Sequence, residues 1–230
     1  MRPNLSSAAL PGLMLLAGIP GWSIASAQTA SAQPSATPGK DEYAALLKRV
    51  QEGDTTVDMR AFRIAGVLSL GAHGGMREAG ERHAFRKLAD SRDYQGALDS
   101  ANAALARNYA SIVNHFDAMV ACQALQKTGE AAIHQKLLNA LLDSIQNSGD
   151  GKSPETAWFV VTTDEEYLFL GRVLGVKVKS QGLVPKDGHF YDRMEVINPK
   201  TDKSQSVWFN TDMDMGAYKP SGQNKGGPPN

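Results

Sequence analysis

Five polar residues have side chains suited to binding or catalysis: His115, Asp150, Lys152, His189 and Asp192. A histidine beside a carboxylate can take up and return a proton near neutral pH, which is the chemistry of many hydrolases. Asp150 and Lys152 would add a fixed acid and a mobile base. These five residues form the candidate ligand-binding set, and the sequence assigns a catalytic role to none of them.

Two of the five lie in the most conspicuous segment, Ser148–Ser153, which reads Ser-Gly-Asp-Gly-Lys-Ser. A phosphate-binding loop would need glycine where Gln146 stands, and it would follow a strand rather than a helix. A calcium loop would need glutamate where Ala157 stands. The segment is therefore interpreted as a helix end capped by Gly149, followed by a tight turn into a strand.

The sequence predicts no metal and no cofactor. Asn210, Asp212 and Asp214 alternate along an extended segment, but a calcium loop needs glycine where Met215 stands. The chain has no Gly-Xaa-Ser-Xaa-Gly motif and no dinucleotide-binding glycine pattern after a strand.

The histidines form no paired metal signature. His115 and His134 are expected on neighbouring antiparallel helices joined by a turn centred near 128–129. This register places position 142 opposite His115, so His134 would be displaced by about eight residues, or roughly 12 Å. The two rings are therefore predicted to lie apart.

The charge balance excludes several classes of function. Lysine and arginine number 24, aspartate and glutamate number 24, and the formal charge is zero. No excess positive charge is available to bind nucleic acid or an anionic membrane. The one cysteine, Cys122, excludes a disulfide framework and is interpreted as a small core residue of a helix.

The first residues resemble a secretory signal peptide. Arg2 precedes an apolar stretch, Ala8–Ile19. The small residues Ala25–Ala27 offer a cleavage site that would leave Gln28 first, and Ala30–Ala32 offer a second one that would leave Gln33 first. Twelve apolar residues span roughly 18 Å as a helix, which is too short to cross a bilayer core of about 30 Å. The protein is expected to be exported to the periplasm or beyond, without membrane insertion after signal cleavage.

Five regions are expected along the chain. They are a signal peptide (1–27), a disordered linker (28–40), a helical subdomain (41–147), a small α+β subdomain packed on it (148–215) and a disordered tail (216–230).

Helical hairpins are predicted for the first subdomain. Tyr94, Ala97, Ala101 and Ala104 place one bulky and three small residues on one helix face, a spacing that lets a partner helix approach closely, as in tetratricopeptide repeats. The match is incomplete because Tyr109 stands where the repeat usually has proline, and a generic helical bundle remains an alternative.

A small antiparallel sheet with one covering helix is predicted after residue 153. Strands are expected at 157–161, 176–184, 190–197 and 204–210. Residues 190–197 alternate, with Phe190, Asp192, Met194 and Val196 on one side of the strand. Thr163 with Glu166 is interpreted as a capping box that starts a helix over 164–174. The fold class is therefore α+β.

Several segments together resemble an uncharacterised family of secreted bacterial proteins, known as a domain of unknown function. The segments are Tyr94–Ala97, His115, Gly129–Ala131, Ser148–Ser153, Thr156–Trp158, Glu165–Tyr167, Tyr191–Asp192 and Trp208–Asn210. The resemblance implies an exported α+β domain with tetratricopeptide-like helices and implies no activity.

Two functions are compatible with the sequence. The first is a non-catalytic binding or scaffold module for a protein, a peptide or an envelope component, bound in the helical groove or at the sheet edge. The alternative is a hydrolase-like enzyme with a His/Asp site at the junction of helices and sheet.

Overall fold

The computed structural model describes residues 39–71 and 74–219, which belong to one compact unit, Ala36–Asn230. The predicted signal peptide, most of the linker and most of the tail lie outside the described residues. Both predicted subdomains fall within the compact unit. No helix in the described part of the chain is long and apolar enough to cross a membrane.

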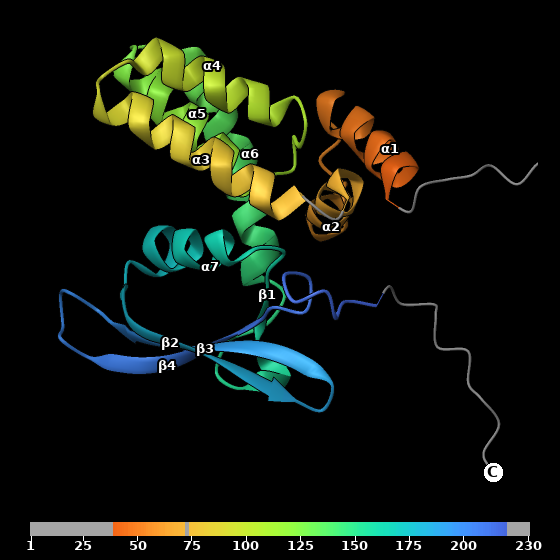
Figure 1. Ribbon diagram of the computed structural model, residues 1–230, viewed down its shortest axis with the longest axis vertical. Helices are drawn as coiled ribbons and strands as arrows, with labels where there is room; N and C mark the ends of the chain where they lie inside the picture. Colours follow the sequence, from red (N-terminus) through yellow and green to blue (C-terminus); the bar gives the residue numbers. More distant parts are fainter. Residues whose placement is uncertain (1–38, 72–73, 220–230) are drawn as a thin grey trace, which may run out of the picture. The chain divides into compact units, whose positions relative to one another are not determined.

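The predicted α+β class is confirmed, since helices fill the first half and a sheet fills the second (Figure 1). Consecutive helices pack against one another, and Asp58, Asp93 and Ser111 cap helix N-termini through their side chains. The helices are α1 (Lys40–Gln51), α2 (Met59–Leu70), α3 (Gly74–Asp90), α4 (Tyr94–Leu105), α5 (Ile112–Ala124) and α6 (Thr128–Gln146).

The small-residue face of α4 packs as the sequence predicts. Ala97, Ala101 and Ala104 are buried, and the first two belong to a cluster with Cys122 of α5 and Phe85 of α3. The interpretation of Cys122 as a core residue is confirmed, and its thiol is free.

Ala101→Leu is expected to lower the free energy of unfolding by about 1–3 kcal/mol, because three added carbon atoms overpack this face. Ala103→Leu is the matched control, since Ala103 is exposed on the same helix. Equal melting temperatures for the two variants would contradict the close packing of α4.

The sheet contains β1 (Trp158–Phe159), β2 (Lys177–Lys186), β3 (His189–Ile197) and β4 (Ser204–Asn210), in the order β1-β4-β3-β2. Strands β2, β3 and β4 are antiparallel as predicted, but β1 is parallel to β4, so the sheet is mixed. No hairpin joins β1 to β4, and the whole of α7, β2 and β3 intervenes between them. The direction of β1 relative to β4 is therefore not constrained by a connecting turn.

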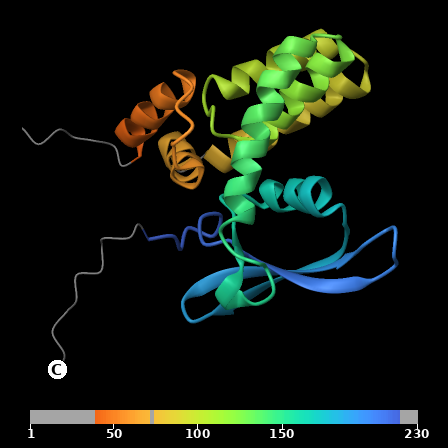
Figure 2. The ribbon, with the colours of Figure 1, turned by 180° about the vertical axis from the view of Figure 1, so that it is seen from behind.

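One face of the sheet is covered by α7 (Thr163–Phe169), which continues as a π-helical turn, Leu170–Leu174 (Figure 1 and, from behind, Figure 2). The predicted alternation of β3 is confirmed, because Asp192, Met194 and Val196 are buried on this face. The predicted capping box is wrong. Thr163 is the first helical residue, and its hydroxyl donates to Asp214 instead of capping the helix.

Two acidic side chains meet between α7 and the sheet. Glu166 is fully buried and Asp192 is 6% exposed, and Gln181 of β2 donates to both carboxyl groups. Burial first, and then the neighbouring Asp192, raises the pKa of Glu166 to about 10. Glu166 is therefore protonated at neutral pH in the folded protein.

Because the pKa of Glu166 is raised, its contribution to stability is complete below its ordinary pKa of about 4.5 and is lost as the pH rises towards 10. We expect Glu166→Gln to be more stable relative to wild type at pH 8 than at pH 5, by about 2–4 kcal/mol. Urea denaturation at both pH values measures this difference. Glu52→Gln, at an exposed site, should show no such gain, and parallel pH profiles for wild type and Glu166→Gln would contradict the assignment.

Candidate functional site

The segment Ser148–Ser153 closes on itself as a loop. Asp150 accepts hydrogen bonds from the Lys152 backbone (3.1 Å) and from the Thr156 hydroxyl (2.6 Å), and it pairs with the Lys152 ammonium (2.8 Å). The hydrogen bond from the Lys152 side chain, and then that from Thr156, lowers the pKa of Asp150 to about 2. Asp150 and Lys152 lie on the surface and hold this loop in shape.

His115 is buried within the helices. Its Nε2 lies 2.8 Å from the carbonyl oxygen of Tyr109, and its Nδ1 lies 3.0 Å from Nδ1 of His134. Because a carbonyl only accepts, His115 carries its proton on Nε2 and accepts from the Nδ1–H of His134. Burial lowers the pKa of His115 to about 4, so the ring is neutral at pH 7.

The predicted separation of His115 and His134 is therefore wrong. Helix α5 ends at Ala124 and α6 begins at Thr128, so the turn is centred near residue 126 rather than 128–129. This register brings position 137 opposite His115. The remaining offset is about three residues, or roughly 4.5 Å, which side chains can span.

His189 and Asp192 lie on opposite faces of β3. Nδ1 of His189 is 2.6 Å from Oδ2 of Asp212, and Oδ1 of the same carboxylate accepts from the backbone N–H of Phe190 (2.7 Å). Asp192 faces α7, as described above. Apart from Asp150 with Lys152, no hydrogen bond or ion pair joins two of the five candidate residues in the described part of the chain.

A cavity of about 280 Å³ lies where the helices meet the start of α7. It occupies the predicted junction, but none of the five candidate residues lines it. Its polar lining comes from five separate parts of the chain: Arg63 (α2), Glu78 (α3), Asn108, Ser111 and Asn114 (α4 to α5), Thr162–Glu165 (start of α7) and Asp214.

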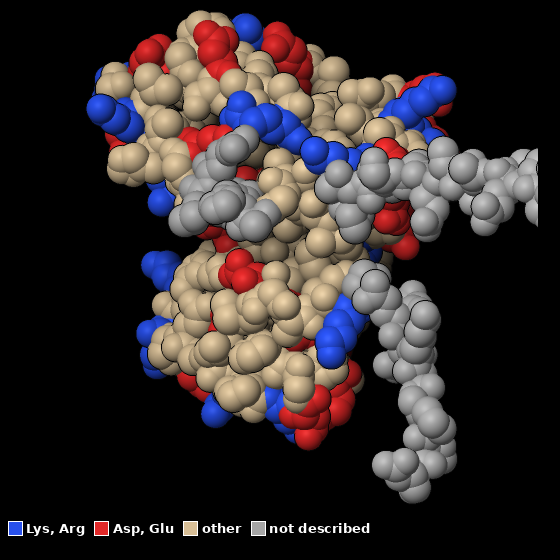
Figure 3. All heavy atoms as spheres, turned by 45° about the vertical axis from the view of Figure 1, so that its right-hand side comes forward, with Lys and Arg blue, Asp and Glu red and all other residues tan. Residues whose placement is uncertain are grey.

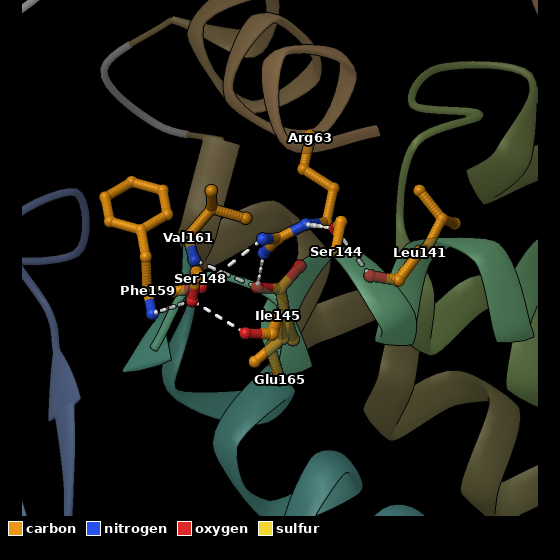
Figure 4. A network of polar contacts seen from close by, with 8 residues as sticks. All are labelled: Arg63, Leu141, Ser144, Ile145, Ser148, Phe159, Val161 and Glu165. Carbon is orange, nitrogen blue, oxygen red and sulfur yellow. Dashed lines mark hydrogen bonds and ion pairs between the residues drawn. The ribbon is translucent and has the colours of Figure 1, made fainter. Parts of the chain in front are cut away.

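Arg63 and Glu165 form one wall of the cavity. The guanidinium is fully buried and donates to Oε2 of Glu165 (2.5 Å), to Ser144 (3.0 Å) and to the carbonyl of Phe159 (3.3 Å), as Figure 4 shows. Val161 also donates to Glu165, at 2.9 Å. Burial raises the pKa of Glu165 and lowers that of Arg63, while the opposite charge of each partner counteracts both shifts.

Carboxylates outnumber cations in the lining. Glu78 accepts a hydrogen bond from Asn108 (2.9 Å), and Asp214 accepts one from Thr163 (2.5 Å). Burial is the main cause that raises the pKa of Glu78 to about 7, and the charge of Glu165 adds to it. Figure 3 shows acidic side chains near the boundary between the helical part of the molecule and the part formed by α7 and the sheet.

Asn114 supplies an unused hydrogen-bond donor. Its residue is 4% exposed, and its Nδ2 has no hydrogen-bond partner among the described residues. A buried amide N–H group without a partner costs about 1–3 kcal/mol.

A second cavity is apolar. It measures about 440 Å³ and is lined mainly by Val50, Val57, Met59, Tyr109, Ile133 and Leu137, between the α1–α2 turn and α6. In the described residues, no group of three or more His, Cys, Asp or Glu side chains could hold a metal ion. The junction cavity is therefore the site where polar groups converge, and it is the candidate functional site.

Residues 38–219 match the family described as "Domain of unknown function (DUF4919)", and the chain belongs to this family. Searches of curated proteins and of solved structures found no match. Membership confirms the predicted resemblance to an uncharacterised family and assigns no activity.

Proposed function

We propose that the protein is an exported, non-catalytic binding module whose ligand occupies the junction cavity. The observation that carries this proposal is the convergence of polar side chains from five parts of the chain, four carboxylates among them, on one partly enclosed cavity. The ligand is a small polar molecule, or the polar end of a peptide or envelope component, since about 280 Å³ is below the usual range for drug-sized ligands.

The sheet edge is a poor alternative site. The edge strand β1 has only 2 residues. The other edge strand, β2, carries Lys177, Lys179, Pro185 and Lys186 together with an irregular register between Val178 and Ser180. Charges, proline and bulges on an edge strand oppose the addition of a further strand. These features favour the cavity over strand pairing as the means of binding.

A cavity-filling variant tests the proposal. Val67 is partly buried and lines the cavity, so Val67→Phe should occupy the space that a ligand needs. Native mass spectrometry after incubation with a small-molecule extract of cell envelopes should detect a ligand on wild type. It should also detect the ligand on Ile133→Phe, because Ile133 lines the second, apolar cavity instead. Retention of the ligand by Val67→Phe would overturn the proposal.

One observation favours the hydrolase-like alternative. Asp212 orients His189 while leaving the histidine side chain 55% exposed, so its Nε2 could act as a general base. Among the described residues, no serine, threonine or cysteine side chain hydrogen-bonds His189, so a hydrolase would have to activate water. Loss of ester hydrolysis in His189→Ala would support this alternative, and equal rates would remove it.

The proposed export rests on the amino-terminal sequence. We expect the mature protein to begin at Gln28 or Gln33. N-terminal sequencing of protein from the cell-envelope fraction measures this directly. Recovery of the intact chain from Met1 in the cytosol would contradict export.

A further inference from the structure

We propose that the second, apolar cavity binds a free aliphatic carboxylate of medium chain length, whose chain lies in the cavity and whose carboxylate pairs with Lys136. This inference concerns a different cavity from the one in the proposed function, so either can hold without the other.

The size and the lining of this cavity suit an aliphatic chain. Its volume of about 440 Å³ lies within the usual range for ligand pockets, about 300–1,000 Å³. Val50 and Val57 are buried, and Met59 and Leu137 are partly buried against the same hydrophobic cluster. An aliphatic chain placed among these side chains leaves water for apolar contacts, which favours binding.

One wall of the cavity is held in place by contacts outside it. The wall residue Tyr109 donates its backbone N–H to the hydroxyl of Tyr43 (2.7 Å), and its carbonyl oxygen accepts from His115 (2.8 Å). The ring of Tyr109 also meets that of His115 edge-on, with the centroids 4.8 Å apart. A wall that is already ordered loses little conformational entropy when a ligand binds.

The unpaired charge at the cavity is positive. The charged residues of the lining are Asp54 and Lys136. Asp54 pairs with Arg49 (2.8 Å) and accepts from the hydroxyl of Thr56 (2.7 Å). Lys136 is exposed, and within the described part of the chain it forms no ion pair. Its ammonium group, on a flexible stem, is therefore available to a ligand's carboxylate.

The surroundings of the cavity favour a small molecule over a protein partner. Of the large apolar side chains that are exposed in the described residues, Ile133 alone lines the cavity. A stable protein interface covers about 800 Å² on each partner and has an apolar centre. One exposed isoleucine does not supply such a surface, whereas a partly enclosed aliphatic lining can surround a chain.

Octanoate is the probe, and octanol is its neutral counterpart. Isothermal titration calorimetry of the mature protein at pH 7 should show saturable binding of octanoate and weaker binding of octanol. Each buried CH₂ group tightens binding by a factor of about three to four, so affinity should rise about tenfold from hexanoate to octanoate.

A variant of the lysine tests the carboxylate contact. Lys136→Met keeps an apolar stem and removes the charge, so it should bind octanoate about fivefold more weakly and octanol as wild type does. Lys179→Met, at an exposed site of β2, is the matched control and should behave as wild type. Equal octanoate affinities for Lys136→Met and wild type would overturn the carboxylate class.

A variant of the lining tests the cavity itself. Ala140 is partly buried in this lining, and Ala140→Leu should weaken the binding of both compounds at least tenfold. In native mass spectra, a ligand of this cavity is recognised by its loss from Ala140→Leu. Unchanged octanoate binding by Ala140→Leu, or no binding by wild type, would overturn the proposal. If Ala140→Leu fails to fold, Lys136→Met at its exposed site still decides the outcome.

Discussion

Replacing Arg63 by methionine is expected to lower the free energy of unfolding by about 3–5 kcal/mol. The fully buried guanidinium donates to Glu165, Ser144 and the carbonyl of Phe159. Without it, the carboxylate of Glu165 would remain buried beside a single backbone donor. A loss of this size is a large part of the stability of an ordinary domain, which is about 5–15 kcal/mol.

Urea denaturation measures this loss, and two further variants serve as controls. Arg60→Met removes an exposed arginine from the same helix and should cost less than about 1 kcal/mol. Adding Glu165→Gln to Arg63→Met should restore part of the loss, since no charge then remains buried. If Arg63→Met proves as mild as Arg60→Met, the pair contributes little to the fold.

Gly149→Ala is expected to cost about 3 kcal/mol, at the upper end of the cost of overpacking. A Cβ at this position would lie 2.7 Å from the carbonyl oxygen of Ala157 and closer still to that of Thr156. The main chain would have to move, which would weaken the hydrogen bond from Phe159 to Ser148 that ties β1 to the end of α6.

Gly129→Ala is the matched control for this loop variant. Gly129 lies in the first turn of α6, and an added Cβ there would have open space around it. It should stabilise the protein by about 0.5–1 kcal/mol, because alanine loses less conformational entropy than glycine in a helix. Thermal unfolding should therefore show a lower melting temperature for Gly149→Ala and a higher one for Gly129→Ala. Equal shifts would contradict the close packing of the loop.

Local patterns predicted the elements well. Periodicity located the helices, and the alternation of β3 placed Asp192, Met194 and Val196 on the buried face. The interpretation of 148–153 as a turn was close, although Asn147 rather than Gly149 is the C-cap of α6. Helices, strand alternation and turns depend mainly on residues close together in the sequence, so the local sequence pattern predicts them.

The site depended on long-range packing and was not predicted. Arg63 and Glu165 are 102 residues apart in the chain, and Glu78, Asn114 and Asp214 come from three further segments. Arg63 did carry a signal, since it follows Phe62 on the buried stripe of α2, where a charge needs a partner. The sequence could not say which acid that partner was. The histidine pair was missed because a shift of two or three residues in the turn changes which side chains face each other.

The distance along the chain between Arg63 and Glu165 also affects the order in which the protein can assemble. At about 5–20 residues per second, a ribosome makes Glu165 about 5–20 s after Arg63. Until then, docking α2 onto α6 would bury an uncompensated positive charge, so the newly made helices gain little by closing. A chain held open during synthesis would be compatible with the export proposed above.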